Sequence, residues 1–323
     1  MYIVFLKLDL KFRCWKGYLN LSKRRRLKQG GLLITKMKIA IIGSSGFLGT
    51  KLMNFFSKEH KVLGTYIKNE KPGLQKLDAT NKNDVEELIS EYRPDVVIDT
   101  VALTSSITCE KNPRLCKTLN YTTAKNIADA CKKTGSKMVF ISSSYIFDGK
   151  KGDYEETDKP NPKNEYAKYK VLAEREVLNI QNSLVIRVDI MYGYNGKKEK
   201  NGVFGNSILR EEEIKLKEPD QIRTPVFVED VARSILFLTE KKQSGIFHVA
   251  GMEKMKMIYF LKNLEKTVRK KTKISVDDDK TQRHPVKIPF NATLNNAKIV
   301  RLGFKFGSFT NNLATLKKQY LEK

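Results

Sequence analysis

A tyrosine and a lysine stand four residues apart at the start of a predicted helix, where Tyr166 is followed by Lys170. Residues at this spacing share one face of a helix. A phenol has an ordinary pKa of about 10, so it is a poor proton donor near neutrality. A neighbouring ammonium and a positively charged nicotinamide ring would stabilise the phenolate and lower that pKa. The alternative is that both side chains line a solvated helix face, as most pairs of this type do.

Upstream of the tyrosine, the run Ser142 to Ser144 closes a predicted strand over residues 137–142. A serine hydroxyl beside the phenol could polarise a substrate carbonyl while hydride arrives from a cofactor. We therefore interpret the serine, the tyrosine and the lysine together as the catalytic group of an NAD(P)-dependent oxidoreductase.

A glycine-rich turn precedes these residues in the chain. An apolar run over residues 39–42 leads directly into Gly43, Gly46 and Gly49, with the spacing G-x-x-G-x-x-G, and an amphipathic stretch begins at once. A strand, a tight turn and a helix in this order let backbone N–H groups approach a pyrophosphate at the positive end of the helix dipole. The context favours dinucleotide binding over a glycine turn that binds nothing.

The remaining pattern alternates strands with helices. Strands are predicted over residues 61–66, 74–78 and 95–100, and helices over 84–92 and 113–134. This alternation predicts an α/β fold, a Rossmann-type doubly wound parallel sheet that binds its ligand at the carboxyl ends of the strands. We expect an NAD(P)-binding domain over 37–190 and a smaller C-terminal α/β substrate-binding part over 191–323.

The second strand indicates which dinucleotide binds. It ends in Thr65-Tyr66 without the acidic residue that holds the ribose 2′-hydroxyl of NAD, and Lys68 and Lys71 follow. Cations without an acid favour the 2′-phosphate, so we expect NADP(H), with NAD(H) as the alternative, and Lys68 as a cofactor contact. The lysines could also lie in a solvated loop.

Charge and cysteine content exclude other classes. The net charge is +25, but residues 1–36 hold ten of the 61 Lys and Arg residues and one of the 36 acids, and the rest is scattered. This distribution disfavours a nucleic-acid partner. We expect residues 1–36 to be a disordered basic extension, an artefact of an upstream start codon or else a basic anchor for membrane or RNA. The cysteines lack metal-binding spacing and no apolar run is long enough to span a membrane, so we predict no metal and a cytoplasmic protein.

Taken together, residues 37–305 resemble the extended short-chain dehydrogenase/reductases, and most closely the dTDP-4-dehydrorhamnose reductase-like branch. The resemblance rests on GSSGFLG, LDATN, SSSYIFDG, YEETDKPNPKNEYAKYK, VIRVDIMYG and DQIRTPVFVEDVA. It implies Ser143 as the catalytic hydroxyl, Tyr166 as general acid, Lys170 as its electrostatic partner and Asn120 as the residue that supports the lysine through water. The family pattern also places near the cofactor Gly43, Ser45, Gly46, Phe47, Leu48, Asp78, Ala102 and Lys170.

The sequence departs from that pattern on the substrate side. Arg223 replaces a glycine, Ile190 an aromatic residue and Ser144 an acid, while the usual N-A-A after the fourth strand becomes Asp99-Thr100-Val101. We expect Ser144, Ile190 and Arg223 at the substrate, with Arg283 meeting a diphosphate or else lying free on the surface.

The resemblance implies an NADP(H)-dependent reductase of a 4-keto nucleotide-sugar that acts alone or as a homodimer. One alternative is an epimerase or dehydratase of the same substrate class. The other is a non-catalytic NADP-binding subunit similar to the β subunit of methionine adenosyltransferase, whose partner would be the catalytic subunit of that enzyme.

Overall fold

The computed structural model describes residues 26–29, 32–194, 213–268, 273–276 and 286–321. The chain divides into two compact units, residues 1–36 and residues 37–323, and each is described by itself. In the first unit, β1 (Arg26–Gln29) and β2 (Leu32–Thr35) pair as antiparallel strands. No regular element was expected in this part of the sequence. The other residues of the predicted extension lie outside the described ranges.

The second unit is built on a 7-stranded parallel sheet of order β13-β8-β7-β6-β3-β4-β5. The strands are β3 (Lys38–Ile42), β4 (Lys61–Tyr66), β5 (Leu74–Lys76), β6 (Val96–Asp99), β7 (Lys137–Ser143), β8 (Leu184–Val188) and β13 (Gly245–Val249). The strand order reverses between β3 and β6, whose carboxyl ends are adjacent in the ladder through Ile42 and Asp99. This confirms the Rossmann-type fold, in which a reversal of strand order marks the usual place for a ligand.

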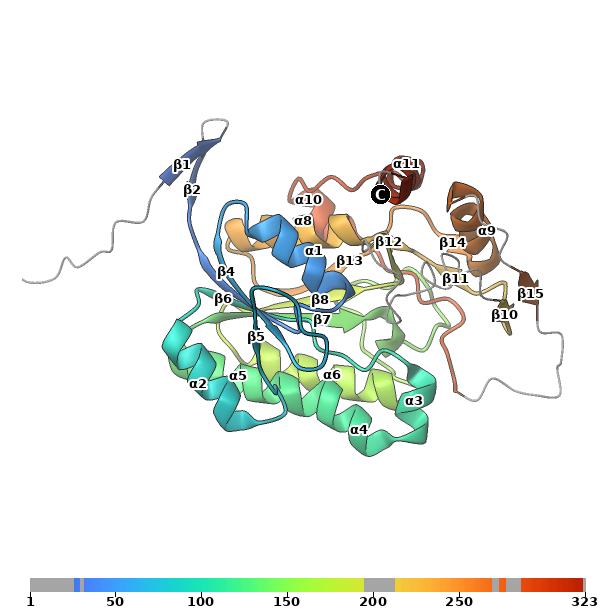
Figure 1. The fold of residues 1–323 in the computed structure, drawn as a ribbon. Coiled ribbons are helices and arrows are strands. Elements are labelled where there is room, and N and C mark those ends of the chain that lie inside the picture. Colours follow the sequence, from blue (N-terminus) through green and yellow to red (C-terminus); the bar gives the residue numbers. More distant parts are fainter. Residues whose placement is uncertain (1–25, 30–31, 195–212, 269–272, 277–285, 322–323) are drawn as a thin grey trace, which may run out of the picture. The chain divides into compact units, whose positions relative to one another are not determined.

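Helices cover both faces of the sheet (Figure 1). On one face lie α2 (Lys82–Tyr92), α5 (Thr123–Thr134) and α6 (Glu165–Leu178), with the short α3 (Ser106–Lys111) and α4 (Pro113–Lys117) nearby. On the other face lie α1 (Phe47–Phe56), α8 (Val228–Glu240) and α10 (Ala297–Arg301). Alternate residues of each central strand point to opposite faces, so Ile41 packs toward α1 and α8 while Ala40 packs toward α2 and α5.

The predicted helix over residues 113–134 is divided in the structure. Between α4 and α5, residues Thr118–Thr122 form one π-helical turn, which contains the buried Asn120. Such single turns occur often at functional sites. Helical periodicity alone does not reveal the extra residue in the turn, because the apolar positions on either side keep nearly the same spacing.

The C-terminal part adds small paired strands and two helices. The pairs are β9 (Met191–Tyr192) with β12 (Val226–Phe227), β10 (Ile214–Leu216) with β15 (Ile274–Val276), and β11 (Ile222–Arg223) with β14 (Met255–Lys256). Helices α9 (Met257–Val268) and α11 (Phe309–Leu321) pack with β9, β10 and β12 in a separate apolar cluster. Among the described residues, no helix has the length and apolar character to cross a membrane.

Candidate active site

The turn between β3 and α1 lies at the switch point of the sheet. Gly43 has φ +81°, and its N–H donates to the Thr65 hydroxyl at 3.2 Å, while the Ser44 N–H donates to the Thr65 carbonyl at 2.8 Å. Gly46 is the N-cap of α1, and the first turn of this helix carries no acidic residue. The turn therefore presents the positive end of a helix dipole at the carboxyl edge of the sheet, beside the half-buried Ser45 and Phe47 and the buried Leu48.

The space around each glycine shows whether a side chain could be accommodated there. A Cβ on Gly49 would lie 2.5 Å from the Ser44 Cα and 2.7 Å from the Gly43 carbonyl, so the helix can approach the turn only with a glycine there. A Cβ on Gly46 would be 3.4 Å from its nearest neighbour, which is ordinary contact. The turn is thus a close-packed backbone cradle, and it fits the phosphates of a dinucleotide.

The two lysines after β4 lie in different places. The Lys71 ammonium reaches the turn, donating to the Ser45 carbonyl at 2.9 Å and to the Thr50 hydroxyl at 3.1 Å. Lys68, which was predicted to contact the cofactor, is exposed. Sequence reasoning noticed Lys71 but did not select it, because spacing after a strand does not indicate which side chain folds back over a loop.

Two further residues predicted near the cofactor follow the ends of strands. The Asp78 carboxylate accepts hydrogen bonds from the Thr80 N–H and hydroxyl at 2.9 and 2.7 Å, which forms a local turn before α2. Ala102 is exposed, three residues beyond the end of β6.

Ser143 and Tyr166 come together as predicted. Ser143 is the last residue of β7, and Tyr166 is the second residue of α6, which the Asn164 carboxamide caps by accepting the Ala167 N–H at 2.9 Å. Both side chains are largely buried, at 9% and 8% exposure, and the Ser143 hydroxyl lies near enough to the Tyr166 phenol to act on its pKa. A carbonyl oxygen placed between these two hydroxyls would have two donors aimed at it.

The acidity of Tyr166 differs from the sequence-based expectation. Burial raises the pKa of its phenol to about 12, and the hydrogen bond with Ser143 lowers it by a smaller amount. The sequence predicted that Lys170 lowers the pKa of Tyr166, and the chain alone does not produce that lowering. Desolvation of the phenolate dominates, and the phenol is firmly protonated at neutral pH.

Lys170 lies one turn along α6 with only 2% exposure. Its ammonium donates to the Ile141 carbonyl at 2.9 Å and lies 4.5 Å from the centre of the Phe140 ring. Burial lowers the pKa of Lys170 to about 8, whereas the nearby carboxylates of Asp99 and Glu174 raise it. The solvated-face alternative for this residue is wrong, because the side chain points into the layer between the sheet and α6.

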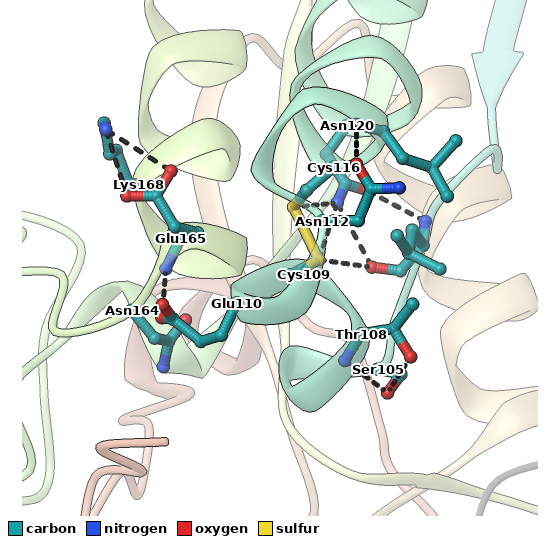
Figure 2. Close-up of a disulfide and its surroundings, with 12 residues drawn as sticks. Ser105, Thr108, Cys109, Glu110, Asn112, Cys116, Asn120, Asn164, Glu165 and Lys168 are labelled. Carbon is teal, nitrogen blue, oxygen red and sulfur yellow. Dashed lines mark hydrogen bonds and ion pairs between the residues drawn. A yellow bond between two sulfur atoms is a disulfide. The ribbon is translucent and has the colours of Figure 1, made fainter. Parts of the chain in front are cut away.

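Asn120 fixes the segment that follows β6. Its carboxamide accepts the Leu103 N–H at 3.0 Å and donates to the Leu103 carbonyl at 3.1 Å, which fixes the segment after β6. The amide also lies 3.2 Å from the sulfur of Cys116 and 3.7 Å from that of Cys109 (Figure 2). The predicted support of Lys170 through water stays a prediction.

The two sulfurs beside Asn120 belong to a disulfide that the sequence analysis did not predict, Cys109–Cys116. It joins α3 to α4, and both cysteines are fully buried in an apolar cluster with Tyr166 and Tyr169. In the same segment, the Glu110 carboxylate accepts the N–H of Glu165 at 2.9 Å, at the start of α6 (Figure 2). The disulfide-closed segment therefore holds the start of the helix that carries Tyr166. A spacing of seven residues has no distinctive pattern, so only the fold shows that the two cysteines meet.

Ser144 takes a structural role instead of the predicted substrate contact. It is fully buried, and its hydroxyl donates to the Asp189 carboxylate at 2.8 Å. The same carboxylate accepts the N–H of Thr224. The Ser144 hydroxyl proton is thus used in a contact that joins the ends of β7 and β8 to the segment between β11 and β12. Ile190 is half-buried, and its carbonyl accepts the Val226 N–H at 2.8 Å.

Arg223 is also buried, with 0% exposure, which differs from the predicted substrate contact. Its guanidinium donates to the backbone carbonyls of Ile222, Pro289 and Phe290 at 2.7 to 3.0 Å. It also lies 5.5 Å from the ring centre of Tyr145. The planar fork of donors matches this cage of carbonyls, which a glycine could not bind. Arg283 lies outside the described residues.

Tyr145 is a site residue that the sequence analysis missed. Its ring meets that of Tyr166 edge to face with centroids 6.2 Å apart, and Arg223 lies on its other side. It is half-buried in the cluster around Tyr166. Its position two residues after Ser143 was the available signal, since the strand end that carries the Ser143 hydroxyl also places the next side chains near Tyr166.

Comparisons with known proteins agree with this geometry. The family described as "RmlD substrate binding domain" matches residues 37–322. The chain belongs to this family. Its membership confirms the resemblance to the extended short-chain dehydrogenase/reductases and their dTDP-4-dehydrorhamnose reductase-like branch.

Relatives with different names share the fold and the sequence. A dTDP-4-dehydrorhamnose reductase from Bacillus anthracis, solved in complex with NADP, is 25% identical with a TM-score of 0.78, covering 90% of this chain and 100% of that one. The Xenopus laevis methionine adenosyltransferase 2 subunit beta is 31% identical over 70% of this chain and 71% of its own length. A probable low-salt glycan biosynthesis reductase, Agl14 of Haloferax volcanii, is 32% identical over 65% of this chain and 73% of its own.

Proposed function

We propose that this protein is an NADP(H)-dependent reductase that converts the ketone of a 4-keto nucleotide-sugar into an alcohol. The observation that carries the proposal is the buried Ser143 hydroxyl beside the Tyr166 phenol at the carboxyl end of β7, with the glycine cradle two strands away in the same sheet. The relatives named as reductases, one of them bound to NADP, support the choice of cofactor and substrate class.

Each side chain has one task in this reaction. The Ser143 hydroxyl donates a hydrogen bond to the ketone oxygen, and the Tyr166 phenol transfers its proton to that oxygen as the carbonyl carbon is reduced. When bound, the reduced nicotinamide supplies the hydride. The buried ammonium of Lys170 then stabilises the phenolate that is left. A phenol whose pKa is raised to about 12 by burial keeps its proton until that charge develops.

The residues that would hold the cofactor follow from the cradle. The turn from Gly43 to Gly46 and the first turn of α1 would face its phosphates, and the Lys71 ammonium lies across the same turn. The exposed Lys68 is expected to contribute little to binding of the 2′-phosphate. NAD(H) is the alternative cofactor, and the absence of an acid at the end of β4 favours NADP(H).

The test is oxidation of NADPH, followed by absorbance, with dTDP-4-keto-6-deoxy-L-mannose as substrate. We expect Tyr166→Phe to lower kcat about 1,000-fold, because general acid catalysis contributes roughly 10²–10⁴-fold. Tyr169→Phe, on the same helix and in the same cluster, is the matched control and should stay within about twofold of the wild type. Equal activity of Tyr166→Phe and wild type would contradict the proposal.

A second candidate function rests on the 31% identity to a methionine adenosyltransferase 2 subunit beta. In this hypothesis the chain binds NADP(H) without turnover and regulates a methionine adenosyltransferase catalytic subunit. Tight NADPH binding without oxidation on a panel of 4-keto nucleotide-sugars, together with co-elution with that catalytic subunit in size-exclusion chromatography, would favour it. The same chromatography of the protein alone tests the predicted homodimer.

A further inference from the structure

A buried carboxylate lies in the layer where Lys170 ends. Asp99 is the last residue of β6 and is 1% exposed. One of its oxygens, Oδ1, accepts the Val101 N–H at 2.9 Å. The other, Oδ2, is buried without a hydrogen-bond partner in the described part of the chain. An incompletely bonded, buried carboxylate is a costly feature that an asparagine of the same shape would avoid.

The register of the sheet brings this carboxylate to the lysine. Asp99 is the ladder partner of Phe140 on β7, and the Lys170 ammonium lies over the Phe140 ring. The charged and titratable groups that act on Lys170 are Asp99 from β6 and Glu174 from α6 itself. The charged group that acts on Asp99 is Lys170, and on α5 burial and then the charge of Asp99 raise the pKa of the Cys131 thiol.

Glu174 is already neutralised by another cation. Its two oxygens accept from Nε and Nη2 of Arg187 at 2.9 and 2.7 Å, in a bidentate pair with both side chains buried. Asp99 has no such arginine within hydrogen-bond distance among the described residues. The carboxylate whose charge is available to Lys170 is therefore that of Asp99.

We propose that Asp99 is a positioning residue whose buried negative charge keeps the Lys170 ammonium protonated beside the catalytic pair. The inference rests on the proposed function, because it gives Lys170 the task of stabilising the Tyr166 phenolate. The acid that replaces the asparagine of the family pattern then has a functional role, because its charge and not its shape acts on Lys170.

The protonation states agree with this arrangement. Burial raises the pKa of Asp99 to about 6, with Lys170 opposing, and burial lowers that of Lys170 to about 8, with Asp99 opposing. The carboxylate and the ammonium are therefore both charged between about pH 6 and pH 8. Asp99 raises the pKa of Lys170 more than Glu174 does, so removing its carboxylate lowers the pKa of Lys170 further.

The experiment compares wild type with Asp99→Asn, which keeps an acceptor for the Val101 N–H but carries no charge. The pKa of Lys170 is measured directly as the pH dependence of its acetylation by acetic anhydride, followed by peptide mass spectrometry without cofactor. We expect the midpoint to fall by about one pH unit or more, because opposite charges at short range shift a pKa by about 1–3 units. Asp129→Asn, which removes one charge from the outer side of α5, should leave the midpoint unchanged.

Stability gives a second readout with a defined sign. The pKa of Asp99 in the folded chain lies above its ordinary value, so its stabilising contribution is lost as the pH rises through about 6. Asp99→Asn should therefore have a higher Tm than the wild type, by a margin that grows from pH 5 to pH 8. A variant that fails to fold, or an unchanged acetylation midpoint, would overturn the proposal.

Activity separates this inference from the proposed function. If the protein oxidises NADPH, the basic limb of its kcat profile should move to lower pH in Asp99→Asn by the same interval as the acetylation midpoint. If the wild type neither binds nor oxidises NADPH, the proposed function fails, while the acetylation and unfolding measurements still decide whether Asp99 supports the charge of Lys170.

Discussion

Two regions at the same edge of the sheet are built in different ways. The turn between β3 and α1 is a close approach of backbone to backbone, in which a Cβ on Gly49 would meet backbone atoms 2.5 to 2.9 Å away. The layer between β6, β7 and α6 consists of buried charges, namely Asp99, Lys170 and the Glu174–Arg187 pair. The turn binds by shape and by the dipole of a helix, so its requirement is steric. The charged layer requires a carboxylate and an ammonium to remain ionised away from water, so its requirement is electrostatic.

The largest effect should come from the charged layer. Glu174→Gln leaves the guanidinium of Arg187 buried without its counter-charge, and we expect a loss of about 3–5 kcal/mol in the free energy of unfolding. Glu165→Gln on the same helix breaks only the exposed pair with Lys168 and should cost below about 1 kcal/mol. Chemical denaturation measures both. Equal losses would show that the two pairs are equivalent and would end the distinction between buried and exposed charge.

The turn should respond to volume rather than to charge. Gly49→Ala forces a methyl group into the backbone of Ser44, and we expect a loss of about 2–3 kcal/mol in the free energy of unfolding. Gly46→Ala, in the same turn, meets its nearest atom at 3.4 Å and should leave the stability nearly unchanged. A Gly46→Ala protein as unstable as Gly49→Ala would contradict the steric account of the turn.

The smallest effect tests whether the turn also uses a charge. Lys71→Met removes the ammonium that lies across the turn, and NADPH affinity should fall about tenfold, since a hydrogen bond to a charged group contributes about 1.5–3 kcal/mol. Lys68→Met should change it less than about twofold, because the side chain is exposed. Fluorescence titration of NADPH measures both. A larger loss for Lys68→Met would restore Lys68 as the contact to the 2′-phosphate.

The difference between the regions also explains which parts of the site could be predicted. The glycine spacing was evident beside an apolar strand, and at Gly43 and Gly49 it reflects a steric requirement on residue type. Tyr166 and Lys170 were evident for a similar reason, since four residues along one helix must share a face. The carboxylate that acts on Lys170 is that of Asp99 on β6, 71 positions away in the sequence, and no local pattern joins the two.

The substrate side shows the limit most clearly. Ser144 and Arg223 occupy positions where the family pattern differs, yet the structure commits the first to Asp189 and the second to the carbonyls of Pro289 and Phe290. A polar side chain at the end of a strand can serve a ligand or the fold. Which of the two it does depends on the partners that long-range packing brings within about 3 Å.

The sequence by itself determined the parallel sheet, the glycine turn, and the serine, tyrosine and lysine, because each depends on periodicity or spacing within one or two adjoining elements. Only the tertiary structure decided that burial raises the pKa of Tyr166, that Lys71 and not Lys68 reaches the turn, that Cys109 meets Cys116, and that Asp99 faces Lys170. Desolvation and charge pairing depend on which atoms surround a group in space, and residues distant in the sequence supply most of those atoms.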